Sequence, residues 1–259
     1  MIMVLDIGNT TIALGVFQAR KLLANWKIKS DREKTADEYG LILSSLLGHE
    51  KLTCQKIKGA IVSSVVPPLT PVIQQAIERF FKVKPLLVGP GLKTGLPILY
   101  ENPAEVGSDR IVAACAAFEK YGGPCLIVDF GTATTFDAIS AAGEYLGGSI
   151  APGIQISAEA LYLRTARLPR IEIKKPRTAI GRNTVASMQS GLYFGYIGLV
   201  NQIVAEISAE LQSRPTVIAT GGQADLIAPE IKAINQVEPN LVLEGLRLLY
   251  EKNRRREKK

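Results

Sequence analysis

Two apolar stretches of the chain end in the same polar pattern. The first is VLDIGNTT at residues 4–11, and the second is IVDFGTATT at residues 127–135. Each leads through aliphatic residues to aspartate, one apolar residue and glycine, and a further apolar run follows, TIALGVF in the first and TTFDAIS in the second. This order of residues predicts a strand, a tight turn that glycine permits, and a second strand. We therefore expect a β-hairpin at each place.

The two predicted hairpins occupy matching positions in the two halves of the chain. An offset of 123 residues relates three pairs in the 259-residue sequence: Asp6 and Asp129, Gly8 and Gly131, Thr11 and Thr134. Because this offset is close to half the length, the internal similarity predicts two related domains, each of which opens with its own hairpin.

The remaining segments alternate between helical and extended patterns. Helical spacing of apolar residues is found in TADEYGLILSSLLG, in PPLTPVIQQAIERFF and over residues 183–211, whereas KGAIVSSVV, KPLLVG and PTVIAT are typical of strands. We predict an α/β chain with one domain at residues 1–117 and a second at residues 118–251, linked by the helix RIVAACAAF. Residues 252–259 are predicted to be a disordered basic tail.

The charge of the chain is concentrated at its end. The sequence has 31 Lys and Arg against 24 Asp and Glu, a net charge of +7, and the final KNRRREKK carries +5 of it. The body is therefore nearly neutral, a terminal basic run is more often solvated than bound, and nucleic acid is not an expected partner. The start of the chain has no export-signal pattern, and no apolar run reaches the ~18 residues of a membrane span. We expect a cytoplasmic protein that does not bind membranes.

The histidine and cysteine content excludes several kinds of site. His49 is the only histidine, which excludes Ser-His-Asp hydrolases, histidine-ligated metal enzymes and protein kinases with an HRD loop. The spacing of Cys54, Cys115 and Cys125 argues against a disulfide framework and against a zinc site. Acid–base chemistry would then fall to carboxylates, and electrophilic help to backbone amides, Lys, Arg or a hard cation.

The long predicted helix contains three interior glycines, Gly191, Gly195 and Gly198. An interior glycine costs a helix roughly 1 kcal/mol relative to alanine, so we expect another element to approach the backbone closely there. A subunit interface and packing within the chain both remain open.

The two hairpins suit a nucleotide. A glycine turn after a strand exposes backbone N–H groups, and threonine hydroxyls add donors, so such a turn can surround phosphate oxygens. An aspartate at the strand end can hold Mg²⁺ or its water shell. The competing motifs are missing, because the sequence has no Gly-Lys pair for a P-loop and VGPGLKTG breaks the dinucleotide pattern.

Five motifs, DIGNT, GSDR, DFGTATT, GGSIAPG and GRNT, occur in an order and with a spacing that resemble type III pantothenate kinases. The resemblance runs from Met3 to about Tyr250. The duplicated hairpins also resemble the phosphate motifs of the wider superfamily of acetate kinase, sugar kinases, Hsp70 and actin. The resemblance implies two duplicated ribonuclease-H-like domains that bind ATP in the cleft between them, and ATP-dependent phosphorylation of pantothenate in coenzyme A biosynthesis. It further implies Mg²⁺ with ATP, a monovalent cation, K⁺ or NH₄⁺, and a homodimer.

The resemblance also implies roles for individual residues. The implied ATP-binding residues are Asp6, Ile7, Gly8, Asn9, Thr10, Thr11, Ile12, Ala13, Thr132, Gly221 and Gly222. The implied pantothenate-binding residues are Tyr100, Gly107, Ser108, Asp109, Arg110 and Thr184. Asp109 would be the general base, Asp129 would hold the monovalent cation, and Asp6 would lie near Mg²⁺ and contact it indirectly, through its water shell. Ser108 stands where the resemblance leads us to expect alanine.

The residues alone leave other interpretations open. Asp109 and Ser108 could simply cap a helix, as could Asn183 and Thr184, although Arg110 beside Asp109 is suited to hold a substrate carboxylate or phosphoryl charge. An ordinary aspartate, with pKa ~3.9, is a weak base, so part of the role of Asp109 would be orientation. The alternatives for function are another small-molecule kinase of the superfamily and a nucleotide-binding regulator without transfer activity.

Overall fold

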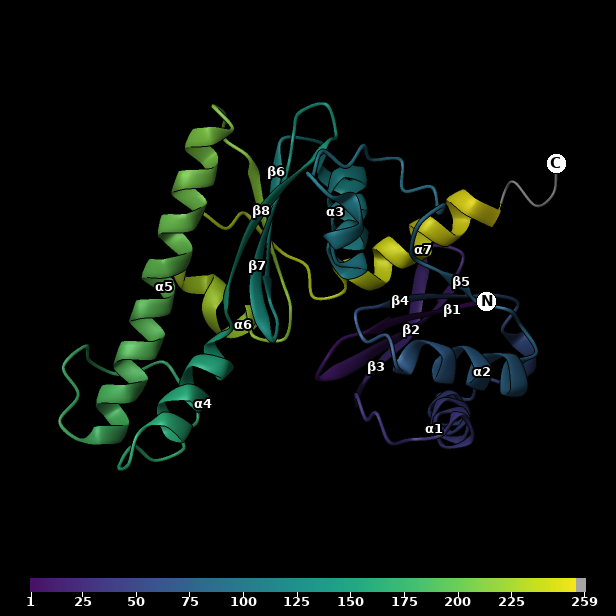
Figure 1. The fold of residues 1–259 in the computed structure, drawn as a ribbon, viewed down its shortest axis with the longest axis horizontal. Coiled ribbons are helices and arrows are strands. Elements are labelled where there is room, and N and C mark those ends of the chain that lie inside the picture. Colours follow the sequence, from purple (N-terminus) through teal and green to yellow (C-terminus); the bar gives the residue numbers. More distant parts are fainter. Residues whose placement is uncertain (255–259) are drawn as a thin grey trace. The chain divides into compact units, whose positions relative to one another are not determined.

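The computed structural model describes residues 1–254 and divides the chain into two compact units (Figure 1). The N-terminal unit consists of Met1–Gly95, Glu101–Ala116 and the segment from Leu241 onward. The C-terminal unit consists of Leu96–Tyr100 and Ala117–Asn240. Each unit has one five-stranded sheet with helices packed on it, which confirms the predicted α/β class.

The sheet of the N-terminal unit has the strand order β3-β2-β1-β4-β5. Its central strand β1 pairs antiparallel with β2 and parallel with β4. β1 is almost wholly apolar and largely buried, as expected for a strand that is covered on both faces. The strands are β1 (Ile2–Ile7), β2 (Thr11–Gln18), β3 (Lys21–Lys29), β4 (Ala60–Ser64) and β5 (Leu86–Leu87).

Different helices cover the two faces of this sheet. Helices α1 (Ala36–His49) and α2 (Leu69–Phe81) share an apolar cluster with Met3, Leu5 and Ile7 of β1. The two helices pack against each other (Figure 1). Gly40 of α1 leaves room for the Phe80 ring of α2, because a Cβ on Gly40 would lie 2.2 Å from an atom of that ring. Helix α7 (Leu241–Arg254) packs on the opposite face.

The sheet of the C-terminal unit has the strand order β10-β9-β6-β7-β8. The helices α4 (Ile154–Arg164), α5 (Thr184–Glu210) and α6 (Ala224–Ile227) join one apolar cluster with alternate residues of β6. Figure 1 shows α5 as the longest of these three ribbons. The strands are β6 (Cys125–Phe130), β7 (Ala133–Ile139), β8 (Tyr145–Pro152), β9 (Thr216–Thr220) and β10 (Gln236–Val237).

The remaining elements are connectors. Helix α3 (Ser108–Tyr121) has residues up to Ala116 in the N-terminal unit and the rest in the C-terminal unit. Three short 3-10 helices complete the described chain: η1 (Cys54–Lys56), η2 (Pro103–Glu105) and η3 (Ala228–Glu230). No helix within residues 1–254 is long and apolar enough to cross a bilayer.

The two sheets have equivalent topologies, which supports the predicted duplication. In each, a three-stranded antiparallel meander is extended by two parallel strands. The register corrects the predicted alignment at one point, because Ile7 pairs with Ile12 whereas Phe130 pairs with Thr134. The second turn is therefore one residue shorter, so Thr134 is equivalent to Ile12, and the predicted match between Thr11 and Thr134 is wrong.

Two segments belong to a different unit from the one predicted. α7 was expected in a second domain at residues 118–251, but Leu243 packs against Gly15 of β2, and Gly245 lies against Val112 of α3. Leu96–Tyr100 was expected in a first domain at residues 1–117, but its backbone bonds to Tyr145 of β8. In both cases contacts distant in sequence decide the packing.

The basic tail is described only in part. Residues 252–254, predicted to be disordered with the rest of the tail, are the last residues of α7. Residues 255–259 lie outside the described residues, and the prediction for them stays a prediction.

Candidate active site

The first hairpin turn lies at the end of β1. The N–H of Gly8 donates to the Thr11 carbonyl over 3.0 Å, and Ser30 closes the turn, with its hydroxyl donating to the Gly8 carbonyl over 2.5 Å. Asn9, Thr10 and Thr11 are exposed at the tip, where their polar groups can meet a ligand. The side chains of Ile7 and Ile12 are fully buried in the core, so these two predicted residues could contact ATP only through their backbone.

Asp6 lies beside the end of the parallel strand β4. In the sheet register it pairs with Ala13 of β2 on one side and with Ser63 of β4 on the other. Its side chain is half-buried. The predicted metal-side carboxylate therefore stands at the end of a buried strand, next to the tip of the turn.

Ser63 and Ser64 join β4 to the start of α3. The hydroxyls of Ser63 and Ser108 lie 2.9 Å apart. The Ser108 hydroxyl also accepts from the N–H of Ser64 over 3.2 Å and donates to the Ser64 carbonyl over 3.1 Å. Ser108, the one departure from the expected motif, is thus the residue that attaches α3 to β4. The two serines in the otherwise apolar AIVSSVV indicate a polar contact at this strand, but nothing near them in the sequence indicates Ser108 as the partner.

Asp109 and Arg110 follow in the first turn of α3. Asp109 Oδ1 accepts a hydrogen bond from the N–H of Arg110 over 2.8 Å. The same oxygen lies 2.5 Å from the position that a Cβ on Gly107 would take, so the carboxylate occupies the space left by the missing side chain of this glycine. Burial raises the pKa of Asp109, an effect that the N–H and the charge of Arg110 partly offset. Arg110 is itself buried. Asp109 is therefore a stronger base than the ordinary carboxylate expected from the sequence.

The second hairpin turn has Asp129 at the end of β6. The neighbouring parallel strand β9 ends at Thr220, which pairs with Asp129, and turns at Gly221 with φ +97°. A Cβ on Gly221 would lie 2.4 Å from Asp129 Oδ1 and 2.6 Å from the Phe130 backbone. The structure thus brings together two predicted residues that are far apart in sequence, and only glycine fits at the turn.

The other predicted residues of the C-terminal unit lie on exposed or half-buried surfaces. Thr132 is exposed on the turn after β6, and Gly222 is exposed after β9. Asn183 caps α5, since its side chain accepts from the N–H of Ala186 over 2.8 Å, and this confirms capping for Asn183. Thr184 is exposed in the first turn of that helix, and the Tyr100 ring packs against Tyr145.

The predicted residues thus form two groups. In the N-terminal unit the structure holds together the end of β1, the end of β4 and the start of α3, with Asp6–Ala13 and Gly107–Arg110. In the C-terminal unit it holds together the ends of β6 and β9, with Asp129 beside Gly221. The roles of all these residues stay predictions.

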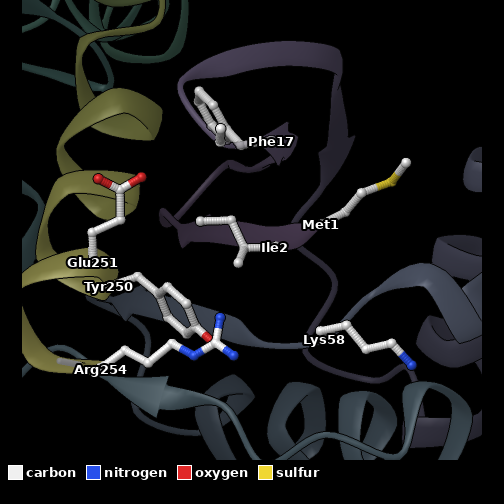
Figure 2. Close-up of a pocket in the computed structure, with 8 residues that line it drawn as sticks. Met1, Ile2, Phe17, Lys58, Tyr250, Glu251 and Arg254 are labelled. Atoms are coloured by element: carbon white, nitrogen blue, oxygen red, sulfur yellow. The ribbon is translucent and has the colours of Figure 1, made fainter. Parts of the chain in front are cut away.

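A pocket of the N-terminal unit lies away from these residues. The cavity has a volume of about 500 Å³. Met1 and Ile2, at the start of β1, line it (Figure 2), whereas Asp6 is close to the other end of that strand. None of the predicted site residues lines it. Its lining residues are Met1, Ile2, Phe17, Ala19, Lys58, Tyr250, Glu251 and Arg254.

Comparison with known proteins decides the family. The family model of type III pantothenate kinase matches residues 2–206. A protein of that name from Moorella thermoacetica is 53% identical over 253 residues, which cover 98% of this chain and 100% of the relative. Another, from Bacillus cytotoxicus, is 56% identical, and the alignment covers 98% of this chain and 97% of the relative.

The chain belongs to the type III pantothenate kinase family.

Solved structures share its fold. A protein from Campylobacter jejuni assigned to the Baf family of transcriptional activators has a TM-score of 0.59 at 18% identity, and the match covers 98% of this chain and 99% of that one. A protein from Sinorhizobium meliloti assigned as a 2-dehydro-3-deoxygalactonokinase also has a TM-score of 0.59, at 14% identity, with 98% and 97% covered. At these identities the likeness shows the fold alone.

Membership of a kinase family implies ATP with a divalent metal, and the donors present fit that chemistry. Among residues 1–254 no cluster of three or more His, Cys, Asp or Glu side chains could hold a metal ion. A divalent cation such as Mg²⁺ needs only one or two carboxylates when substrate phosphates and water complete its coordination, and a single carboxylate such as Asp6 is compatible with that requirement.

Proposed function

We propose that this chain transfers the γ-phosphoryl group of ATP to the 4′-hydroxyl of pantothenate in the cytoplasm, the first step of coenzyme A biosynthesis. The products are 4′-phosphopantothenate and ADP. The observation that carries the proposal is its 53–56% identity, over nearly the whole chain, to proteins named type III pantothenate kinase. The half-buried Asp109 beside the buried Arg110 supplies chemistry that suits the transfer.

Asp109 would act as the general base. As the oxygen of the substrate hydroxyl bonds to the γ-phosphorus and the bond to ADP breaks, the carboxylate accepts the hydroxyl proton. A raised pKa brings the carboxylate closer to the pH at which it works, which favours proton transfer. The short contact with the Arg110 N–H holds one carboxylate oxygen in place, so the other is available to the substrate.

Arg110 and the first hairpin would bind anionic groups. A buried guanidinium can hold the pantothenate carboxylate or the charge of the transferring phosphoryl group. The exposed Asn9, Thr10 and Thr11 would meet the ATP phosphates. When bound, Mg²⁺ neutralises charge on the β- and γ-phosphates. Asp6 would orient the water shell of that ion.

The proposal is tested with the purified chain, ATP, Mg²⁺, K⁺ and pantothenate, with the phosphorylated product measured directly. Asp109→Asn keeps the size and the hydrogen-bond acceptor of the side chain and is expected to lower kcat by about 10²–10⁴-fold, the usual contribution of a general base. ATP binding without transfer to pantothenate would overturn the proposal. A panel of alcohol and sugar acceptors would then separate another small-molecule kinase from a regulator without transfer activity.

Asp129 is proposed to hold a monovalent cation, K⁺ or NH₄⁺. A single carboxylate next to the Gly221 turn suits a weakly charged ion that needs few anionic ligands. The wild type should therefore gain activity when K⁺ or NH₄⁺ replaces Na⁺ at constant ionic strength, and Asp129→Asn should lose this difference. A variant that keeps the full response to K⁺ would rule out Asp129 as the ligand.

We also propose that the chain forms a homodimer through α5. A Cβ built on Gly191, Gly195 or Gly198 meets no atom of the described residues within 4 Å, so packing within residues 1–254 does not account for these glycines. The side chains of Val185 and Phe194 on the same helix are each 41% exposed. A second copy would bury this surface.

The dimer is tested by light scattering after gel filtration. Gly195→Arg should give a monomer, because the side chain would enter the interface. Gly48→Arg is the matched control, since Gly48 is also a helical glycine with no atom within 4 Å of a built Cβ, but it lies in α1. A wild-type monomer at micromolar concentration, or a dimer that survives in Gly195→Arg but not in Gly48→Arg, would contradict the assignment.

A further inference from the structure

The segment Leu96–Tyr100 is hydrogen-bonded to Tyr145 of β8. The N–H of Leu99 donates to the Tyr145 carbonyl over 2.8 Å, and the N–H of Tyr145 donates to the Pro97 carbonyl over 2.9 Å. Ile98 forms a parallel bridge with Tyr145. Residues on both sides of this segment in sequence belong to the N-terminal unit. Backbone hydrogen bonds to Tyr145 therefore attach the residues just before Tyr100 to the C-terminal unit.

The ring of Tyr145 also contacts the ring of Tyr100. The ring centroids are 6.5 Å apart with the planes tilted by 50°, an arrangement that aromatic pairs favour. On the same strand, Gly147 has φ +114°, and a Cβ there would lie 3.2 Å from Tyr100 Cε2. The Tyr100 ring is thus fitted against Tyr145 and against a glycine that leaves space for it.

Tyr145 is itself fixed by a buried carboxylate. Its hydroxyl donates to Asp137 Oδ1 over 2.7 Å, and the hydroxyl of Thr135 donates to Asp137 Oδ2 over 3.0 Å. Asp137 is 1% exposed and Tyr145 is fully buried. A buried carboxylate is costly unless hydrogen bonds satisfy it, so Asp137 holds the Tyr145 ring in one orientation. Nothing in the proposed chemistry uses this carboxylate directly.

We propose that Tyr145, anchored by Asp137, is a positioning residue that sets the affinity for pantothenate through Tyr100. The inference rests on the proposed function and on the place in the pantothenate site that the sequence resemblance implies for Tyr100. A side chain that is already held in its binding orientation loses little entropy when the substrate arrives, so binding is tighter. Tyr145 acts through Tyr100 and does not touch the phosphoryl group, so the effect belongs in KM for pantothenate.

The test is Tyr145→Phe, which removes one hydroxyl and keeps the ring. We expect KM for pantothenate to rise about fivefold, below the full value of one hydrogen bond to a charged acceptor. KM for ATP and kcat should stay within about twofold of the wild type, because the phosphoryl-transfer groups are unchanged. An unchanged KM for pantothenate, or an equal rise for ATP, would overturn the inference.

A double-mutant cycle separates positioning from general structural damage. In a Tyr100→Ala background, Tyr145→Phe should have no further effect on KM, because the ring that it positions is gone. Independent and additive effects would show that Tyr145 does not act through Tyr100. Tyr193→Phe is the matched control, since Tyr193 is a buried tyrosine of the same unit whose hydroxyl donates to the Leu226 carbonyl.

Two further variants keep the inference testable if Tyr145→Phe does not fold. Asp137→Asn keeps an oxygen acceptor for the Tyr145 hydroxyl, so it should leave KM for pantothenate within about twofold of the wild type. Gly147→Ala pushes on the Tyr100 ring without touching the buried hydrogen bonds and should raise that KM. A normal KM in a folded Gly147→Ala variant would count against the placement of Tyr100.

A readout without activity distinguishes failure of this inference from failure of the proposed function. The full chain labelled with 3-fluorotyrosine gives a ¹⁹F resonance for Tyr100, assigned by its loss in Tyr100→Phe. Tyr145→Phe should shift or broaden this resonance, and Tyr193→Phe should not. If the wild type leaves pantothenate unchanged but the resonance moves, the proposed function fails and the positioning stands. If pantothenate is phosphorylated and the resonance does not move, the positioning is wrong.

Discussion

In both units the strand beside the hairpin aspartate has a buried hydroxyl residue at the position that pairs with this aspartate. Ser63 pairs with Asp6 in the N-terminal unit, and Thr220 pairs with Asp129 in the C-terminal unit. Their hydroxyls make different contacts. Ser63 meets Ser108 at the start of α3, whereas Thr220 donates to the Glu238 carbonyl over 2.7 Å.

The different contacts of Ser63 and Thr220 support the different roles proposed for the two hairpins. In the N-terminal unit the attached segment carries Asp109 and Arg110, the groups proposed for proton transfer and anion binding. In the C-terminal unit the chain after β9 turns at Gly221 against the carboxylate of Asp129. The two units have the same sheet topology, but the segment that contacts the parallel strand differs, and the separate chemistry proposed for each unit follows from this difference.

The largest expected effect comes from exchanging the two aspartates for asparagine, one at a time. Asp6→Asn should lower kcat/KM for ATP by about 10³-fold at saturating K⁺, as removal of a group that stabilises transition-state charge does. Asp129→Asn should act mainly through the response to K⁺. Asp225→Asn, on the exposed surface of α6, is the control. If Asp6→Asn changes the K⁺ response as Asp129→Asn does, the two hairpins do not have separate roles.

A smaller effect is expected when alanine replaces the turn glycines. Gly221→Ala should lower the free energy of unfolding by about 2–4 kcal/mol, because φ is +97° and the Cβ would overlap Phe130 and Asp129. Gly8→Ala should cost only about 1 kcal/mol, since its Cβ would meet the Thr11 carbonyl at 3.0 Å. Urea unfolding of both variants measures the difference. Equal losses of free energy of unfolding would mean that a side chain is tolerated equally well, or equally badly, in the two turns.

Removing the hydroxyl that joins β4 to α3 should cost less again. Ser108→Ala leaves the buried Ser63 hydroxyl and the Ser64 N–H without that contact, and should lower the free energy of unfolding by about 1 kcal/mol. Ser44→Ala, which removes a hydroxyl bonded within α1, is the control for loss of a serine in the same unit. A Ser108→Ala variant with unchanged stability would show that this attachment contributes nothing to the N-terminal unit.

The smallest expected effect is a dependence of stability on pH. Burial raises the pKa of Asp109 in the folded state above its pKa in the unfolded chain. The contribution of Asp109 to folding stability is therefore fully present below its unfolded-state pKa and is lost as the pH rises through its folded-state pKa. Asp109→Asn is neutral at every pH. The free energy of unfolding of the variant minus that of the wild type should therefore be larger at pH 8 than at pH 4, as measured by urea unfolding. A difference that instead grows toward acid pH would contradict the raised pKa of Asp109.

Local patterns predicted most of the elements that carry the candidate site. The apolar runs before Asp6 and Asp129 are β1 and β6, and the glycine after each aspartate opens the predicted turn. The helical spacing over residues 183–211 became α5, which begins after its cap Asn183. These features depend on neighbours in the sequence, so periodicity and turn chemistry suffice to find them.

Other features of the site had no local signal strong enough to predict them. Ser108 was a departure from a motif until the structure placed it against Ser63. Tyr145 and Asp137 are polar residues in strands, and nothing near them in the sequence indicates Tyr100 as their neighbour. The raised pKa of Asp109 depends on burial by residues from several segments.

The sequence by itself determined the duplicated hairpins, the α/β class and, through five ordered motifs, the resemblance to type III pantothenate kinases. Only the tertiary structure decided that the second turn is one residue shorter, that α7 packs on the N-terminal sheet and that Leu96–Tyr100 belongs to the C-terminal unit. The physical reason is the range of the interactions. Strand and helix patterns follow from residues a few positions apart, whereas register, burial and the placing of Tyr100 follow from contacts between residues tens of positions apart.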